Sequence, residues 1–315
     1  MAELGLRGAT FRWCRPLIMG IVNANPDSFS DPGARTVDAV VARALALVDA
    51  GAGALDIGAQ SAITGRTPAD AGVEAAAVGP VVRTVVEECS GVLVSVDTFK
   101  PDVAGAALDA GAHLVNDVSG LRDPTGARLC AEAGAGLVVM HTAAPPLTRL
   151  QDPELYGDVG AEVAGFLAAR IAAAVEAGVP VESIVVDPGV DFTKTPAQSV
   201  ELLRNIGAVV DLGRPVLLAL SRKDFIGALT RRPPAERDAG TLGAVAAMSH
   251  VPDQILRIHD VAATFDLLGV LYVLAGDDPV PADLVLPEAL RHERAGEDRR
   301  AAGGRGPRPP ASGPT

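Results

Sequence analysis

One phrase recurs along this chain and limits what it can fold into: an Ala-rich segment stops at a Gly, and a short apolar run follows. The Gly stops stand in DAGAG at 49–53, DAGAH at 109–113, EAGAG at 132–136 and EAGVP at 176–180. Gly is common just past a helix end because it takes the left-handed backbone conformation without a Cβ clash. The phrase therefore predicts helices that alternate with short strands.

The apolar runs are continuous rather than alternating, which is typical of parallel strands buried on both faces. We predict strands at 17–22, 54–58, 92–97, 113–117, 136–141, 183–187, 215–221 and 255–260. The predicted helices between them include 36–50, 69–88, 101–110, 158–178, 197–210 and 261–273. This repetition predicts an α/β fold, the (β/α)8 TIM barrel. A doubly wound open sheet is the alternative, but the G-x-G-x-x-G turn of a dinucleotide-binding sheet is absent.

The sequence divides into three segments. Residues 1–16 are an N-terminal extension, 17–275 form the predicted barrel, and 276–315 are a tail rich in Pro, Gly and Arg. The last 25 or so residues of the tail hold too little apolar surface to offset the entropy of ordering them. We therefore predict that the tail is mostly disordered.

Charge and cysteine content exclude several classes of protein. The formal net charge is −12, which argues against a nucleic-acid surface, since phosphate contacts need clustered Lys and Arg. No run reaches the roughly 18 apolar residues of a membrane span. The 3 cysteines are far apart and form no C-x-x-C pair, so neither a disulfide framework nor a zinc site is expected. We predict a cytoplasmic protein that binds neither nucleic acid nor membranes.

Polar side chains end every predicted strand, where a TIM barrel carries its active site. In strand order they are Asn23; Asp56; Asp97; Asn116 and Asp117; His141; Asp187; Ser221, Arg222 and Lys223; Arg257 and His259. A single Asp or Asn after a strand is often only a helix cap or a turn former. The convergence of all these strand ends on one rim favours a binding site instead.

The polar residues fall into two chemical sets. Asp97, Asn116 and Asp187 offer acceptors and an amide that suit a planar heterocycle with several N–H groups, and Lys223 suits a carbonyl oxygen of that ring. Arg257 and His259 stand two residues apart and so share one face of the last strand. Since Arg is suited to phosphate, we expect these two to meet an anion.

These residues lie in motifs that resemble the dihydropteroate synthase family from about residue 17 to 275. The matching segments are MGIVNANPDSFSD, LDIG, SVDTFK, VNDVSG, MH, DPGVDFTK, LSRKDFIG, GT and RIHDV. The resemblance implies the same (β/α)8 fold and a transferase of folate biosynthesis. In this reaction a pterin-methyl pyrophosphate loses pyrophosphate with the help of Mg²⁺, and p-aminobenzoate or another amine attacks the resulting cation.

The resemblance also implies roles for individual residues. The pterin would be bound by Asp97, Asn116, Met140, Asp187, Phe192 and Lys223. Asn23, Arg257 and His259 would hold pyrophosphate, and Asn23 would also hold the metal ion. The catalytic residues would be Lys223, Arg257 and His259. Because members of the family are commonly dimeric, a homodimer is expected. The apolar segment 263–274 suits packing on a partner, and packing in the core explains it equally well.

The second-substrate site departs from the family pattern. The second loop of the family reads D-I-G-G-E-S-T-R-P-G, whereas this chain reads DIGAQSAITG, so Ala62, Ile63 and Thr64 replace Thr, Arg and Pro. Asp224 replaces a Ser that helps to hold the benzoate carboxylate, and an added carboxylate there should repel an anionic acceptor. Three interpretations stay open: a working synthase, a related transferase with another acceptor, and a pterin-binding paralogue with little or no synthase activity.

Overall fold

The computed structural model describes residues 1–24, 36–60 and 68–291. The chain divides into two compact units, Met1–Val270 and Leu271–Thr315, and the first of them contains the sheet. No helix within the described ranges is long and apolar enough to cross a membrane.

Eight parallel strands form the central sheet of the first unit. They are β3 (Leu17–Asn23), β4 (Ala54–Gly58), β5 (Leu93–Asp97), β6 (Leu114–Asp117), β7 (Gly136–Met140), β8 (Ile184–Asp187), β9 (Leu217–Leu218) and β10 (Ile255–Ile258). Their order in the sheet is β8-β7-β6-β5-β4-β3-β10-β9. An isolated parallel bridge between Val186 and Val216 joins β8 to β9 and completes the ring. The predicted TIM barrel is confirmed.

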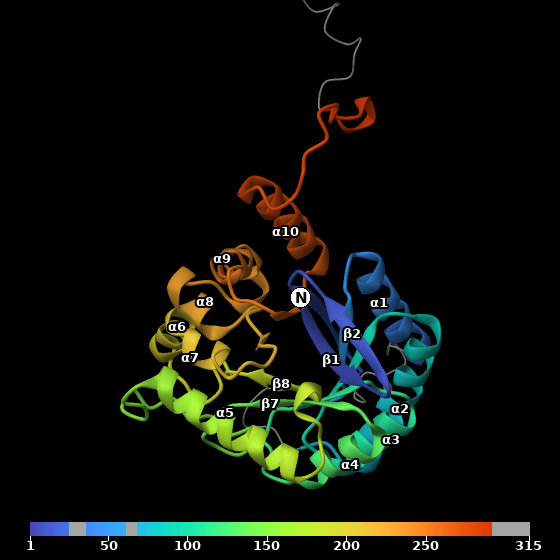
Figure 1. Ribbon diagram of the computed structural model, residues 1–315, viewed down its shortest axis with the longest axis vertical. Helices are drawn as coiled ribbons and strands as arrows, with labels where there is room; N and C mark the ends of the chain where they lie inside the picture. Colours follow the sequence, from blue (N-terminus) through green and yellow to red (C-terminus); the bar gives the residue numbers. More distant parts are fainter. Residues whose placement is uncertain (25–35, 61–67, 292–315) are drawn as a thin grey trace, which may run out of the picture. The chain divides into compact units, whose positions relative to one another are not determined.

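The helices of the described chain alternate with its strands, and those up to α9 lie around the sheet (Figure 1). They are α1 (Val37–Asp49), α2 (Ala71–Glu88), α3 (Pro101–Asp109), α4 (Thr125–Ala133), α5 (Val159–Glu176), α6 (Pro196–Arg204), α7 (Gly207–Val210), α8 (Asp224–Thr230), α9 (Asp238–Met248) and α10 (Val261–Ala275). Gly51, Gly111, Gly134 and Gly178, which mark the predicted helix stops, all take positive φ angles between 62° and 106°.

The sequence did not predict three of the helices or the break within a predicted helix. The helices α4, α8 and α9 begin without a side-chain cap, so the usual start signal is missing from their sequences. The predicted helix 197–210 is two helices, because the chain leaves the helical conformation at Asn205. Within the predicted strand 215–221 only Leu217–Leu218 forms a strand, Val216 makes an isolated bridge to Val186, and the chain turns at Arg222, where φ is 58°.

A hairpin of β1 (Ala2–Leu6) and β2 (Ala9–Trp13) closes the N-terminal end of the barrel. Arg7 and Gly8 both have positive φ, as a tight hairpin turn of this hand requires. The buried hairpin residues Leu4, Leu6 and Trp13 share one core cluster with Leu17, Met19, Ala54, Leu93, Leu114, Val138, Val185, Leu217, Ala219 and Ile255. Residues described from sequence only as an extension are therefore part of the barrel core.

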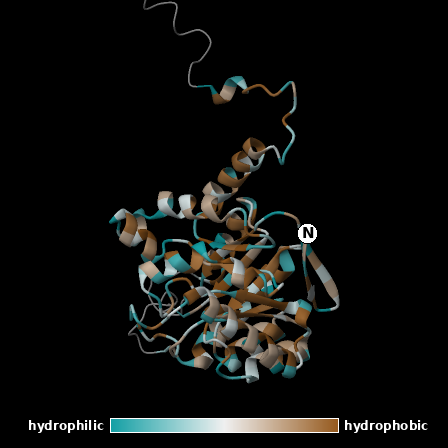
Figure 2. Cartoon of the chain, turned by 60° about the vertical axis from the view of Figure 1, so that its left-hand side comes forward, coloured by the Kyte–Doolittle hydropathy of each residue, from teal (hydrophilic) through white to brown (hydrophobic). Residues whose placement is uncertain are grey.

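The inward faces of the five strands β4, β5, β6, β8 and β10 change character along the strand. Side chains two residues apart share a face, so an apolar residue near the strand start is followed by a polar one near its end. The pairs are Ala54 and Asp56, Leu93 and Ser95, Leu114 and Asn116, Val185 and Asp187, and Ile255 and Arg257. The apolar strand segments stand out in Figure 2. This layering places the polar residues at the carboxyl ends of the strands.

The described part of the second unit holds little regular structure after α10, apart from the short 3-10 helix η4 (Glu288–Leu290). The predicted disorder of the tail falls mainly on residues 292–315, which lie outside the described residues.

The hairpin should stabilise the whole barrel. Leu4 is fully buried, so Leu4→Ala should lower the free energy of unfolding by about 2–5 kcal/mol, as expected for a large-to-small change in a packed core. Urea denaturation followed by circular dichroism measures this. The matched control is Glu3→Ala on the exposed face of the same strand, which should change stability by less than about 0.5 kcal/mol. Equal stabilities for Leu4→Ala and wild type would show that the hairpin does not belong to the folding unit.

Candidate active site

A buried aspartate on β4 connects the ends of four strands. The Asp56 side chain accepts hydrogen bonds from Ser95 Oγ at 2.6 Å, Asn116 Nδ2 at 3.0 Å and Arg257 Nε at 2.6 Å. These partners come from β5, β6 and β10. Sequence reasoning named Asp56 as a strand end but gave it no role. Its place two residues after the inward Ala54 is the signal that could have found it.

Arg257 binds a second carboxylate at the rim. Its Nη2 donates to Asp97 Oδ2 at 2.7 Å, so one guanidinium joins β4, β5 and β10. Burial disfavours the charge of Arg257, but Asp56 and Asp97 outweigh burial and raise its pKa. Gly58 leaves room for this arrangement, because a Cβ on Gly58 would stand 3.2 Å from Asp97 Cβ.

The Asp97 carboxyl is poised near neutrality. Burial raises its pKa from the ordinary value of 3.8 to about 7. Arg257 opposes this shift, whereas the negative charges of Asp56, Glu74 and Asp187 add to it. Burial, with a smaller contribution from the neighbouring carboxylates, therefore places the Asp97 carboxyl near the midpoint of its titration at neutral pH.

Asn116 presents an acceptor to the inside of the site. Its amide nitrogen is used by Asp56, while its Oδ1 is buried and accepts no hydrogen bond from any described residue. A buried acceptor without a donor costs about 1–3 kcal/mol. This oxygen therefore suits a ligand that brings an N–H group.

Asp187 and Lys223 carry opposite charges that attract one another in the site. Asp187 Oδ1 accepts from Gly189 N at 2.7 Å. Burial raises the pKa of Asp187, and Gly189 N and the charge of Lys223 oppose the shift. Lys223 immediately precedes α8 and places Nζ 4.4 Å from the centroid of the Phe192 ring. Met140, which pairs with Asp187 in the β7–β8 register, is fully buried.

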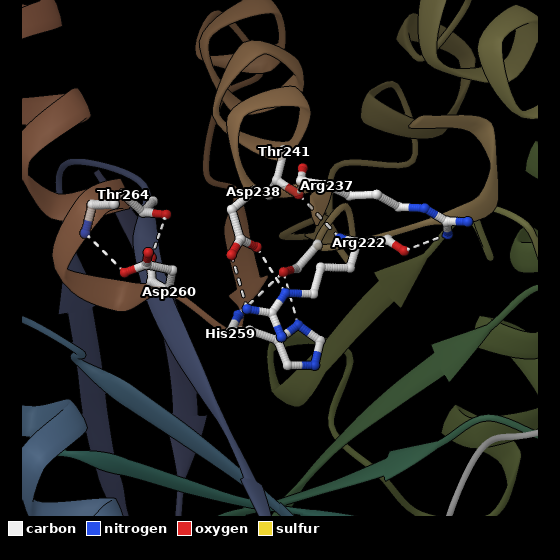
Figure 3. Close-up of polar contacts among 9 residues, drawn as sticks. Arg222, Arg237, Asp238, Thr241, His259, Asp260 and Thr264 are labelled. Atoms are coloured by element: carbon white, nitrogen blue, oxygen red, sulfur yellow. Dashed lines mark hydrogen bonds and ion pairs between the residues drawn. The ribbon is translucent and has the colours of Figure 1, made fainter. Parts of the chain in front are cut away.

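His259 belongs to a second polar cluster at the end of β10 (Figure 3). Its Nδ1 lies 2.8 Å from Ser221 Oγ. Arg222 donates to both carboxylate oxygens of Asp238, at 2.7 and 2.9 Å. Burial lowers the pKa of His259 to about 4, and the charges of Arg222 and Arg257 add to this effect. His259 is therefore a neutral hydrogen-bonding group at pH 7 rather than a cation.

The carboxylate of Asp224 is paired. Arg237 Nη1 donates to Asp224 Oδ1 at 3.0 Å and to the Arg222 carbonyl oxygen at 2.9 Å. The Asp224 side chain is 62% exposed, which weakens the repulsion that the sequence led us to expect. The other altered positions, Ala62, Ile63 and Thr64, lie outside the described residues.

The predicted metal residue, Asn23, ends β3 and is exposed. The described ranges hold no group of three or more His, Cys, Asp or Glu side chains that could bind a metal ion together. A single amide oxygen suits Mg²⁺ that is bound chiefly by substrate phosphates and water.

Lys194 is a site residue that sequence reasoning did not assign. It is fully buried, and its Nζ lies 2.8 Å from His141 Nδ1 and 2.9 Å from the Gly189 carbonyl oxygen. The available signal was composition, because the only lysines of the chain are Lys100, Lys194 and Lys223.

Comparison with known proteins gives one consistent result. The chain matches the pterin binding enzyme family over residues 19–259. It is 40% identical over 258 residues to a dihydropteroate synthase of Streptococcus pyogenes serotype M1, covering 81% of this chain and 94% of that relative. A structure of Xanthomonas albilineans dihydropteroate synthase with 4-aminobenzoic acid superimposes with a TM-score of 0.79 at 41% identity, over 89% of this chain and 99% of the other. The same protein in complex with 7,8-dihydropteroate gives a TM-score of 0.76 at 40% identity, over 89% and 100% of the two chains.

The pKa of Asp97 predicts a pH effect on the ligand-free protein. Between pH 3.8 and about pH 7 the folded protein holds a proton on Asp97 that the unfolded chain has released. The free energy of unfolding should therefore fall as pH rises through this range. Between pH 5 and pH 8 the free energy of unfolding of wild type should fall by more than about 1 kcal/mol relative to that of Asp97→Asn. Urea denaturation at each pH measures the difference.

The matched control is Asp109→Asn, an exposed carboxylate at the end of α3. Its stability curve should run parallel to that of wild type over the same range. A parallel curve for Asp97→Asn would instead show that Asp97 is ionised throughout.

Proposed function

We propose how this chain, which belongs to the pterin binding enzyme family and within it to the dihydropteroate synthases, performs the transferase reaction of folate biosynthesis. The substrate is a pterin-methyl pyrophosphate. Its C–O bond to pyrophosphate breaks, a C–N bond to the arylamine p-aminobenzoate forms, and the amine releases a proton. The observation that carries the proposal is the buried cluster in which Asp56 holds Asn116 and Arg257 beside Asp97.

The pterin ring would be bound inside the barrel rim. Asn116 Oδ1 and the Asp187 carboxylate would accept hydrogen bonds from ring N–H groups, and Lys223 Nζ would donate to the ring carbonyl oxygen. The support for this assignment is the unused Asn116 Oδ1 and the burial of Asp187. Phe192 and Met140 supply apolar surface beside these polar groups.

Departure of pyrophosphate leaves a positive charge on the pterin and a negative charge on the leaving group. The carboxylates of Asp97 and Asp187 would stabilise the first, and Arg257, His259 and Asn23 would receive the second. Fixed charges in a water-poor site stabilise developing charge without having to reorganise. No nucleophile is needed for this chemistry, so we assign the Ser221–His259 hydrogen bond to the placement of His259.

Mg²⁺ is the proposed metal, with Asn23 as its protein ligand. When bound, it would neutralise charge on the leaving pyrophosphate. We further propose a cytoplasmic homodimer. The three free cysteines support the compartment, and the exposed Phe265 and Val270 on α10 support association with a second copy.

The direct test is synthesis of dihydropteroate by the purified protein from pterin pyrophosphate, p-aminobenzoate and Mg²⁺. Asp187→Asn removes the charge while its amide oxygen can still accept from Gly189 N. It should lower kcat/KM about 100-fold, the effect of weakening two hydrogen bonds to a charged group. Asp211→Asn, an exposed carboxylate after α7, is the control and should behave as wild type.

Two results would contradict the assignment in different ways. Pterin binding without turnover would indicate a binding paralogue rather than a synthase. Full activity in Asp187→Asn would remove Asp187 from the pterin site.

An arylamine without a carboxylate is the second candidate substrate, because Asp224 adds a carboxylate that Arg237 pairs but that stays exposed. Asp224→Ser removes one negative charge and frees Arg237 Nη1, so KM for p-aminobenzoate should fall several-fold while KM for an uncharged arylamine stays the same. Glu236→Ser is the matched control, because it removes an exposed carboxylate that pairs with Arg232 instead. Steady-state assays with both amines measure the effect. If Asp224→Ser leaves both KM values unchanged, Asp224 does not face the acceptor.

A further inference from the structure

Lys194 is the largest fully buried side chain in the described structure. It directly precedes Thr195, the N-cap of α6, which forms a capping box with Gln198. Its Nζ contacts His141 Nδ1 at 2.8 Å, the Gly189 carbonyl oxygen at 2.9 Å and the Phe192 carbonyl oxygen at 3.1 Å. Each proton of the ammonium therefore has an acceptor, which is what a buried charge requires.

His141 is a rigid partner for this lysine. Its backbone N–H donates to the Asp187 carbonyl oxygen at 2.9 Å, which ties β7 to β8. Its ring packs edge-on against the Phe166 ring, with centroids 4.8 Å apart. The Tyr156 ring also contacts it, with a centroid distance of 5.8 Å. Burial and the charge of Lys194 lower the pKa of His141 to about 3, so the neutral ring can accept at Nδ1.

The turn that Lys194 holds is conformationally demanding. Gly189, Asp191 and Thr193 have φ angles of 66°, 63° and 51°. A Cβ on Gly189 would collide with the His141 carbonyl oxygen, so the close approach of the turn to the end of β7 requires a glycine at this position. Left-handed residues other than Gly persist only where surrounding contacts impose them. Lys194 binds the carbonyl groups at both ends of the segment from Gly189 to Phe192.

We infer that Lys194 is a positioning residue of the pterin site: its ammonium group fastens the 189–192 turn to His141, and this turn sets the place of Phe192 and, through the Gly189 N–H, of the Asp187 carboxylate. This inference rests on the proposed function, because Phe192 and Asp187 are assigned to the pterin there. Lys194 touches no assigned ligand position itself and acts through these two residues.

The charges around Lys194 show why a lysine is needed rather than an apolar side chain. The titratable groups that face it are His141, Tyr156, Asp187, Asp191 and Lys223. Burial raises the pKa of Asp187, and the charges that oppose this come from Lys223, Arg257 and Lys194. Removal of Lys194 would leave a buried carboxylate with one cation fewer. Burial also lowers the pKa of Lys194 to about 7, so its charge is lost as pH rises above neutrality.

Calorimetric titration of the whole protein with pterin pyrophosphate between pH 6 and 9 tests the inference. At pH 6, Lys194→Met should bind about tenfold more weakly than wild type, as expected for loss of a charged hydrogen-bond partner. The gap should narrow as pH rises, because wild-type Lys194 then loses its own proton. Lys194→Arg keeps the charge and should hold its affinity to higher pH. Lys194→Gln, which is polar and similar in length, should repeat the Met result and serves if Lys194→Met does not fold.

The control is Arg7→Met at the opposite end of the barrel. Arg7 also donates to two main-chain carbonyl groups, those of Leu108 and Ala112, so its loss should lower stability without a pH-dependent change in affinity. A gap between wild type and the Met or Gln variant that does not change with pH would overturn the inference. Equal losses in the Met, Gln and Arg variants would also overturn it, since they would show a purely steric role.

A readout without ligand separates this inference from the proposed function. Nitrogen NMR of His141 should show Nδ1 without a proton in wild type, and a raised pKa of the ring in Lys194→Gln. If wild type does not bind pterin pyrophosphate but His141 behaves in this way, the proposed function fails while the contact between Lys194 and His141 is verified. If Nδ1 of wild-type His141 carries a proton at neutral pH, the inference fails.

Discussion

The ion pair between Asp56 and Arg257 is the interaction on which the site depends. Asp56 is completely buried, and a buried carboxylate is tolerated only when it is paired and hydrogen-bonded. Here Asp56 accepts hydrogen bonds from side chains on three other strands, and one of these, Arg257, also donates a hydrogen bond to Asp97. Removing Arg257 would leave Asp56 without a cation in the core, whereas removing Asp56 would leave Arg257 with Asp97 as its carboxylate partner. The same pair therefore holds the strand ends in register and orients the groups assigned to the ligand.

Burial shifts the pKa values of acidic and basic side chains in the site in opposite directions, because it disfavours the charged form of each. It raises the pKa of Asp97 and Asp187, and it lowers the pKa of Lys223 and His259. Opposite charges restrain these shifts wherever they are close. The arrangement suits a reaction in which charge separates, because groups of both signs are already in place and little solvent has to move.

The structure gives partners to the carboxylates of Asp224 and Asp191. Asp224 looked from sequence like an unbalanced negative charge, yet Arg237 binds it at 3.0 Å and most of its side chain is exposed. Asp191, in the turn before α6, is a second carboxylate near the start of α8. Its Oδ2 accepts from the Phe225 amide at the start of α8, so this carboxylate takes part in local structure. These pairings offset the two carboxylates on the described part of this side of the site.

The sequence by itself determined the barrel and the residues of its rim. Gly stops and continuous apolar runs reflect local rules, namely the left-handed helix end and the two-sided burial of parallel strands, so both could be read without tertiary information. Motifs such as SVDTFK and RIHDV placed Asp97 and Arg257 by resemblance. Only the tertiary structure decided the partners: Asp56 with Arg257, Asp224 with Arg237, and Lys194 with His141. Pairs this far apart in sequence have no local signature, because hydrogen bonds and ion pairs depend on distances that exist only once the strands have closed into a ring.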